Sequence, residues 1–122
     1  MRIQSEAAAS GTYGGRFTGA VEFEMLQEAE ADGRPDVARV RFIDGAVTNW
    51  HRHPGGQHLL LVEGHGRIGT DADGEVEVAP GAFVAAPAGE RHYHGAARGR
   101  SATWVSITFG TTRWEDVAPG GA

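Results

Sequence analysis

Six histidines lie in two groups along this 122-residue chain, and their spacing is of the kind that binds a metal ion. His51 and His53 occupy positions i and i+2, and His92 and His94 repeat that arrangement later in the chain. In a β-strand such residues project from the same face, about 6–7 Å apart along the backbone. Imidazole is the commonest metal ligand because it is a neutral donor near physiological pH. The two pairs therefore predict a metal centre built from two strands.

A further ligand is expected just after the first histidine pair. Residues 54–56, Pro-Gly-Gly, predict a tight turn, after which Gln57 and His58 open a returning strand. Because side chains alternate along a strand, only one of these two can face the first histidine pair. Gln57 would give a site of three histidines and one glutamine, whereas His58 would give a four-histidine site. His65 is predicted to be a solvated turn residue.

Alternation of apolar and charged residues predicts that β-strands position these side chains. Residues 21–25 (Val-Glu-Phe-Glu-Met), 38–42 (Ala-Arg-Val-Arg-Phe) and 75–78 (Glu-Val-Glu-Val) follow a period of two. Residues 104–109 form a β-branched and aromatic run. Turn signals rich in glycine separate these segments, in keeping with 19 glycines in the chain. Strands at this spacing predict an all-β barrel or sandwich.

Length sets the expected domain organisation. A chain of 122 residues matches one ordinary domain. We expect a single domain over residues 1–122, with its core at about 17–112. The small, polar or glycine-rich ends, residues 1–12 and 116–122, are expected to be mobile.

Composition excludes several classes of function. The absence of cysteine removes thiolate catalysis, thiolate metal sites and disulfides. The 11 basic residues are all arginine against 16 acidic ones, and the resulting net charge of −5 argues against a nucleic-acid partner. The N-terminus has no apolar stretch typical of a signal peptide. The longest aliphatic run, residues 59–62, is far shorter than the roughly 20 residues that span a bilayer. We therefore expect a cytoplasmic protein without a membrane partner.

Two spaced motifs resemble those of the cupin family. Residues 45–64 read Gly-x5-His-x-His-x3-Gln-x6-Gly, the first cupin motif with Gln57 where Glu is usual. Residues 81–92 read Gly-x5-Pro-x-Gly-x2-His, the second motif. The resemblance implies a single cupin domain, a double-stranded β-helix or jelly-roll barrel. It also implies that His51, His53, Gln57 and His92 hold one divalent transition metal, and its spacing favours Gln57 over His58.

Within the family, residues 50–57 and 92–96 are similar to a bacterial subgroup that includes manganese-dependent hydroxynitrile lyases. The resemblance implies manganese as the metal, with iron, nickel, cobalt and zinc as alternatives. Lyase members tend to carry His where Trp104 stands here, so cyanohydrin chemistry is not carried over to this chain. Aligning the subgroup's pattern places Trp104, Ser106 and Thr108 inward on the last strand, instead of Val105, Ile107 and Phe109.

The expected chemistry follows from the neutral Gln57 ligand. Without an anionic ligand, a divalent ion keeps its full charge and is a stronger Lewis acid. We therefore expect an enzyme that acts on a small carbonyl or enol molecule, with His94 moving a proton. His94, Trp104 and Thr108 are the candidate catalytic residues. The alternatives are that Trp104 fills the barrel and that His94 makes a structural hydrogen bond. The alternatives are a cupin dioxygenase and a metal-containing binding module without turnover.

The strand expected around residues 17–25 suggests how the chain assembles. Val21, Phe23 and Met25 give it an apolar face, and an uncovered strand edge favours association. In cupins such N-terminal strands often pair with a second subunit. We therefore predict a homodimer, with a monomer whose strand pairs within its own barrel as the alternative.

Overall fold

The computed structural model describes residues 1–4, 9–11, 15–31 and 33–120 of the chain. None of these residues lies in a helix, so no helix that could cross a membrane is found among them. The strands are β1 (Ala9–Gly11), β2 (Phe17–Thr18), β3 (Val21–Gln27), β4 (Asp36–Phe42), β5 (Val47–Thr48), β6 (His51–Arg52), β7 (Gln57–Gly64), β8 (Gly66–Thr70), β9 (Gly74–Val78), β10 (Phe83–Ala86), β11 (His92–Ala96), β12 (Ala102–Thr108) and β13 (Arg113–Trp114).

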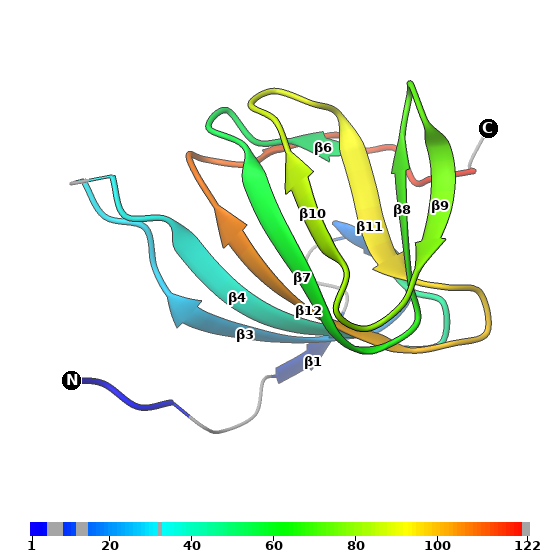
Figure 1. Ribbon diagram of the computed structural model, residues 1–122, viewed down its shortest axis with the longest axis horizontal. Coiled ribbons are helices and arrows are strands. Elements are labelled where there is room, and N and C mark those ends of the chain that lie inside the picture. Colours follow the sequence, from blue (N-terminus) through cyan, green and yellow to red (C-terminus); the bar gives the residue numbers. More distant parts are fainter. Residues whose placement is uncertain (5–8, 12–14, 32, 121–122) are drawn as a thin grey trace.

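Two curled antiparallel sheets form the barrel (Figure 1). One sheet has the order β1-β3-β4-β12-β7-β10. The other has the order β13-β6-β11-β5-β2, and the β8–β9 hairpin joins it by pairing β8 with β11. The predicted all-β jelly-roll barrel is confirmed.

Alternation along the central strands points one set of side chains inward, as predicted. On β4, Ala38, Val40 and Phe42 are buried, whereas Arg39 and Arg41 between them form ion pairs with β3 on the outer face. On β12 the inward set is Trp104, Ser106 and Thr108, and the residues between them are half-buried. The core consists of the buried residues Val21, Ala38, Val40, Phe42, Ala46, Leu59, Leu61, Ala96, Ala102 and Trp104.

The N-terminal region differs from the expectation of one strand with a free edge. Residues 17–18 pair with β5 in one sheet, whereas residues 21–27 pair with β4 in the other. The chain changes sheets at Gly19, whose φ of 98° favours glycine and where a Cβ would lie 2.9 Å from the Cβ of Ala46. β1 pairs with residues 21–23 of β3, so this part of β3 is not an edge.

The two terminal regions that were expected to be mobile are described only in part. Residues 9–11 form β1, so this part of the N-terminal region is a paired strand. The prediction for residues 5–8, 12, 121 and 122 lies outside the described residues. Near the C-terminus, the carbonyl of Val117 accepts a hydrogen bond from the backbone of Trp50 at 3.0 Å.

Candidate metal centre

Strand pairing brings the two histidine groups together. His51 on β6 lies directly opposite His92 on β11, because these residues are Cα partners in the antiparallel pair. His53 follows β6 at the start of the 54–56 turn. One ligand nitrogen from each of His51, His53 and His92 lies within 4.8 Å of the others, and all three residues are buried. The histidine pairs read from the sequence therefore converge on one point.

Each of these three imidazoles is oriented through its Nδ1 atom. His51 Nδ1 lies 2.8 Å from the carbonyl of Asn49, and His92 Nδ1 lies 3.3 Å from that of Glu90. A carbonyl can only accept, so His51 Nδ1 donates and its Nε2 keeps a free lone pair. His92 has an acceptor oxygen near each ring nitrogen, because its Nε2 lies 2.9 Å from Gln57 Oε1. Such outer contacts to metal-binding histidines hold the ring and its tautomer in place.

His53 presents an unpartnered nitrogen to the cluster. Its Nδ1 lies 3.0 Å from Thr112 Oγ1, and its Nε2 is buried without a hydrogen-bond partner among the described residues. A buried polar atom without a partner is costly. An electron-pair acceptor at the centre of the cluster would remove this cost.

Gln57 adds an oxygen to the three nitrogens. Its Nε2 donates a 2.9 Å hydrogen bond to Thr108 Oγ1, and its Oε1 lies 2.9 Å from His92 Nε2. The structure therefore places Gln57 beside the cluster. His58 is exposed on the other face, where its ring packs 5.4 Å from that of Phe83. This arrangement does not bring a fourth imidazole from position 58 to the site.

Burial keeps the cluster uncharged near neutral pH. Burial and the neighbouring His92 lower the pKa of His51 well below its ordinary value. The same two causes lower the pKa of His53 to about 4, and burial lowers that of His92. Neutral imidazoles and an amide oxygen are suitable donors for a borderline divalent ion. The residues present fit a divalent transition metal, without selecting which one.

His94 lies beside the cluster, enclosed by aromatic rings. Its ring centroid is 5.4 Å from that of Phe42 and 5.6 Å from that of Trp104, both in edge-to-face arrangement. Its Nδ1 is buried without a partner among the described residues. Burial, followed by the proximity of His51, lowers the pKa of His94 well below its ordinary value. His94 is therefore a neutral imidazole near neutral pH.

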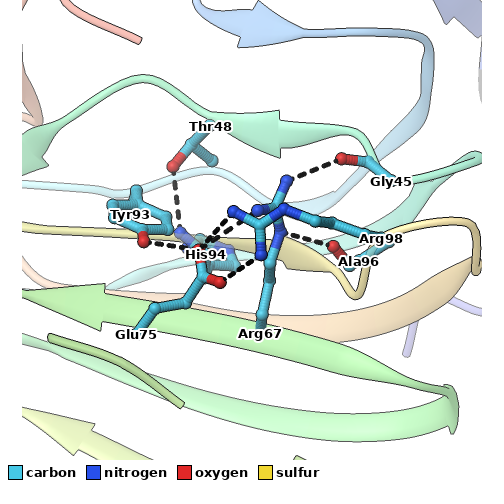
Figure 2. Close-up of polar contacts among 8 residues, drawn as sticks. All are labelled: Gly45, Thr48, Arg67, Glu75, Tyr93, His94, Ala96 and Arg98. Carbon is cyan, nitrogen blue, oxygen red and sulfur yellow. Dashed lines mark hydrogen bonds and ion pairs between the residues drawn. The ribbon is translucent and has the colours of Figure 1, made fainter. Parts of the chain in front are cut away.

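The outer side of β11 is held by a polar network, which Figure 2 shows. Buried Arg67 donates hydrogen bonds to the carbonyls of Ala96 and Gly45, at 2.8 and 3.0 Å, and pairs with Glu75 at 3.1 Å. Glu75 also accepts from the Tyr93 hydroxyl at 2.7 Å. These contacts join the β8–β9 hairpin to the strand that carries His92 and His94.

A cavity of about 400 Å³ opens beside the cluster. Its apolar walls come from β2, β3, β4 and β13, and its polar end carries His51, His53, Gln57 and His94. Of the residues expected on β12, Thr108 and Ser106 line the cavity. This volume lies within the range of small-molecule sites, about 300–1,000 Å³.

Trp104 does not line the cavity, in contrast to its expected catalytic position. It is fully buried and its indole Nε1 donates a 2.9 Å hydrogen bond to the carbonyl of Gly95. Its Cα partners are Val40 and Leu61, deep in the core. Trp104 therefore fills the barrel, and its ring packs against that of His94 beside the site.

Thr112 and Trp114 belong to the site although the sequence did not indicate them. β13 pairs with β6, which places Trp114 opposite His51 with ring centroids 4.6 Å apart. Thr112 precedes this strand and contacts His53. A two-residue strand has no periodicity to read, and the turn before it carries no motif. Neither residue could have been found without the fold.

The barrel and the buried histidine cluster together define this chain as a cupin. The sequence profile described as "Cupin domain" matches residues 38–108, more than half of the chain. This protein belongs to the cupin family.

Among individual proteins, the (R)-mandelonitrile lyase of Granulicella tundricola is similar over most of the chain. It is 36% identical over 106 residues, covering 87% of this chain and 80% of the lyase. The acireductone dioxygenase of Rhodopseudomonas palustris is 40% identical over 47 residues, covering 36% of this chain and 28% of the dioxygenase. The solved structure of a cupin-like protein from Thermotoga maritima superposes with a TM-score of 0.82 at 28% identity, covering 98% and 99% of the two chains.

Proposed function

We propose that this cupin is a metal-dependent enzyme that acts on a small carbonyl- or enol-containing molecule without net oxidation. One observation carries the proposal. A neutral set of three histidines and one glutamine lies at the end of a cavity, beside the buried neutral imidazole of a fourth histidine, His94. This pairs a ligand set for a Lewis acid with a group able to accept a proton.

The chain's own residues divide the chemistry between them. His51, His53, Gln57 and His92 would hold the ion, which when bound polarises a substrate oxygen. Because none of these ligands is anionic, the protein would not offset the charge of the ion, and the bound ion would favour negative charge on that oxygen. His94 accepts or returns the substrate proton through its lone pair.

The cavity walls exclude water from part of the substrate. Phe42 and Val40 present apolar surface next to His94, and Trp114 covers the His51 side. An apolar environment strengthens electrostatic interactions at the reacting atoms. A substrate with an apolar body and a terminal oxygenated carbon fits this division of the cavity.

The comparison with the mandelonitrile lyase supports chemistry at a carbonyl carbon. Trp104 is buried and does not line the cavity, whereas His94 lines it and lies outside the proposed ligand set, so we propose His94 as the group for proton transfer. We propose manganese as the metal, with iron, nickel, cobalt and zinc as alternatives, and a cytoplasmic location.

The matching part of the acireductone dioxygenase favours a second candidate, an oxygen-consuming enzyme of the same fold. A third candidate is a metal-containing binding module without turnover, because a fold does not determine activity. The neutral Gln57 favours the first, since an anionic ligand would better stabilise a trivalent metal.

The test uses the purified chain loaded separately with manganese and with iron. Elemental analysis is expected to find one ion per chain, and none in His53→Ala. Aromatic aldehydes with cyanide, and enolisable ketones in deuterated water, report carbonyl chemistry by chiral chromatography and by proton exchange. Oxygen uptake with enols by the iron form would instead establish the dioxygenase. Stoichiometric metal without either activity would establish the binding module.

A further inference from the structure

The cavity carries a positive charge at its mouth that the proposed chemistry leaves unused. Among the described residues that line the cavity, Arg16 and Asp36 are the charged ones. Asp36 already accepts a hydrogen bond from the backbone of Ala29 at 2.7 Å. Arg16 is exposed, and no carboxylate of the described residues forms an ion pair with it. Its guanidinium is therefore available to a ligand.

The arginines of this chain divide into those that pair with a carboxylate and those that do not. Arg39, Arg41, Arg67, Arg91 and Arg98 each pair with a carboxylate within the described residues. Like Arg16, four other arginines form no such pair among the described residues, namely Arg2, Arg52, Arg100 and Arg113, but none of these four lines the cavity. Arg16 thus combines an unpaired guanidinium with a position at the cavity.

The indole of Trp114 connects Arg16 to the metal-binding end. The guanidinium carbon of Arg16 lies 5.5 Å from the centroid of Trp114, which in turn lies 4.6 Å from the centroid of His51. A cation over an indole face is attracted by its π-system, which holds Arg16 at this place. One aromatic ring therefore separates the positive group at the mouth from the histidine cluster.

We propose that Arg16 binds a carboxylate on the substrate, and that the substrate is a small aromatic or apolar acid whose reacting oxygen lies at the opposite end. This inference rests on the proposed function for that reacting oxygen. The guanidinium presents a planar set of donors that matches a carboxylate. The separation by Trp114 means that the carboxylate and the reacting carbonyl are apart in the substrate, as across a benzene ring, and not adjacent as in a 2-oxo acid.

The experiment compares 4-carboxybenzaldehyde with benzaldehyde and with the methyl ester of 4-carboxybenzaldehyde. Binding to the cobalt-loaded protein is measured by calorimetry and by the change in the cobalt absorption spectrum. The acid is expected to bind about tenfold more tightly than the neutral aldehydes, equivalent to about 1.4 kcal/mol. Solvent at the mouth limits the effect to about this size.

Variants identify the residue responsible for the preference. Arg16→Gln is expected to abolish the preference for the acid, Arg16→Lys to retain part of it, and Arg113→Gln, the matched surface control, to retain all of it. Metal content should be unchanged in all three, because none of these side chains contacts the cluster. An equal preference in Arg16→Gln and the wild type would overturn the proposal.

A second measurement separates this proposal from the proposed function. Benzoate and benzamide are titrated into the metal-free protein, where no carbonyl chemistry is involved. Tighter binding of benzoate that depends on Arg16 supports the carboxylate site even if no aldehyde binds the metal-loaded protein. If neither benzoate nor the carboxylated aldehyde shows binding that depends on Arg16, the carboxylate site is refuted whatever the outcome for the metal.

Discussion

The hydrogen bond between Gln57 and Thr108 makes a sharp prediction about metal affinity. Gln57 Nε2 donates to Thr108 Oγ1 at 2.9 Å, and the exposed fractions of the two residues are 4% and 6%. An amide whose nitrogen is held in this way turns its oxygen toward the histidine cluster. Thr108 is therefore expected to act by positioning Gln57, and not by touching the reacting atoms.

Thr108→Val removes the acceptor while keeping the shape of the side chain. The Gln57 nitrogen is then buried without a partner, which costs about 1–3 kcal/mol. Rotation of the amide recovers part of this cost only by turning the oxygen away from the cluster, so the loss appears in metal binding. Removing an outer contact of a metal ligand typically lowers affinity about 10–100-fold. We expect a loss in this range.

The assay is competition with a coloured chelator at fixed pH, with the wild type, Thr108→Val and Thr108→Ser measured side by side. Thr108→Ser keeps the hydroxyl and should stay within about threefold of the wild type, below the 1.4 kcal/mol that a tenfold change represents. Ser106→Ala is a control on the same face of β12, at a residue that also lines the cavity. Thermal unfolding of the metal-free proteins reports any general destabilisation.

Two outcomes would refute this reasoning. Wild-type affinity in Thr108→Val would mean that the amide orientation does not depend on the hydroxyl. Equal losses in Thr108→Val and Thr108→Ser would mean that packing, and not the hydrogen bond, supports the site. A kinetic effect of Thr108→Val at saturating metal, without any change in affinity, would instead restore the catalytic role first assigned to this residue.

Three further predictions concern the ligand set, the packing behind it and the assembly. Gln57→Glu should slow metal loss to a chelator, because a carboxylate offsets part of the ion's charge; faster loss would mean that position 57 does not contact the metal. Gly69→Ala should lower the free energy of unfolding by about 1–3 kcal/mol, and with it the melting temperature, because the new Cβ would lie 2.2 Å from Cζ of Tyr93. An unchanged melting curve would show that the Tyr93 ring moves aside without cost. Light scattering at micromolar concentration should give about twice 12.9 kDa, the mass of one chain, if the proposed homodimer forms; a mass near that of one chain would exclude it.

Local periodicity explains which parts of the site could be predicted from the sequence. The direction of a side chain on a strand depends only on its position modulo two, and this property needs no knowledge of the partner strand. The His51 and His53 pair, the inward face of β4 and the inward set of β12 all follow from it. The same parity, combined with the motif spacing, favours Gln57 over His58, and the two side chains lie on opposite faces of β7.

Parity does not say how deep in the barrel an inward residue lies, and Trp104 shows the consequence. Trp104 and Thr108 share one face of β12 but are four residues apart, which is roughly 13 Å along a strand. Registers with β4 and β7 place Trp104 opposite Val40 and Leu61 in the core, and Thr108 opposite Gln57 at the cluster. The same inward face of β12 therefore contributes Trp104 to the core and Thr108 to the support of a metal ligand. Only the pairing of distant strands distinguishes these roles, and the same pairing brings Trp114 to the cavity from a strand too short to have a pattern.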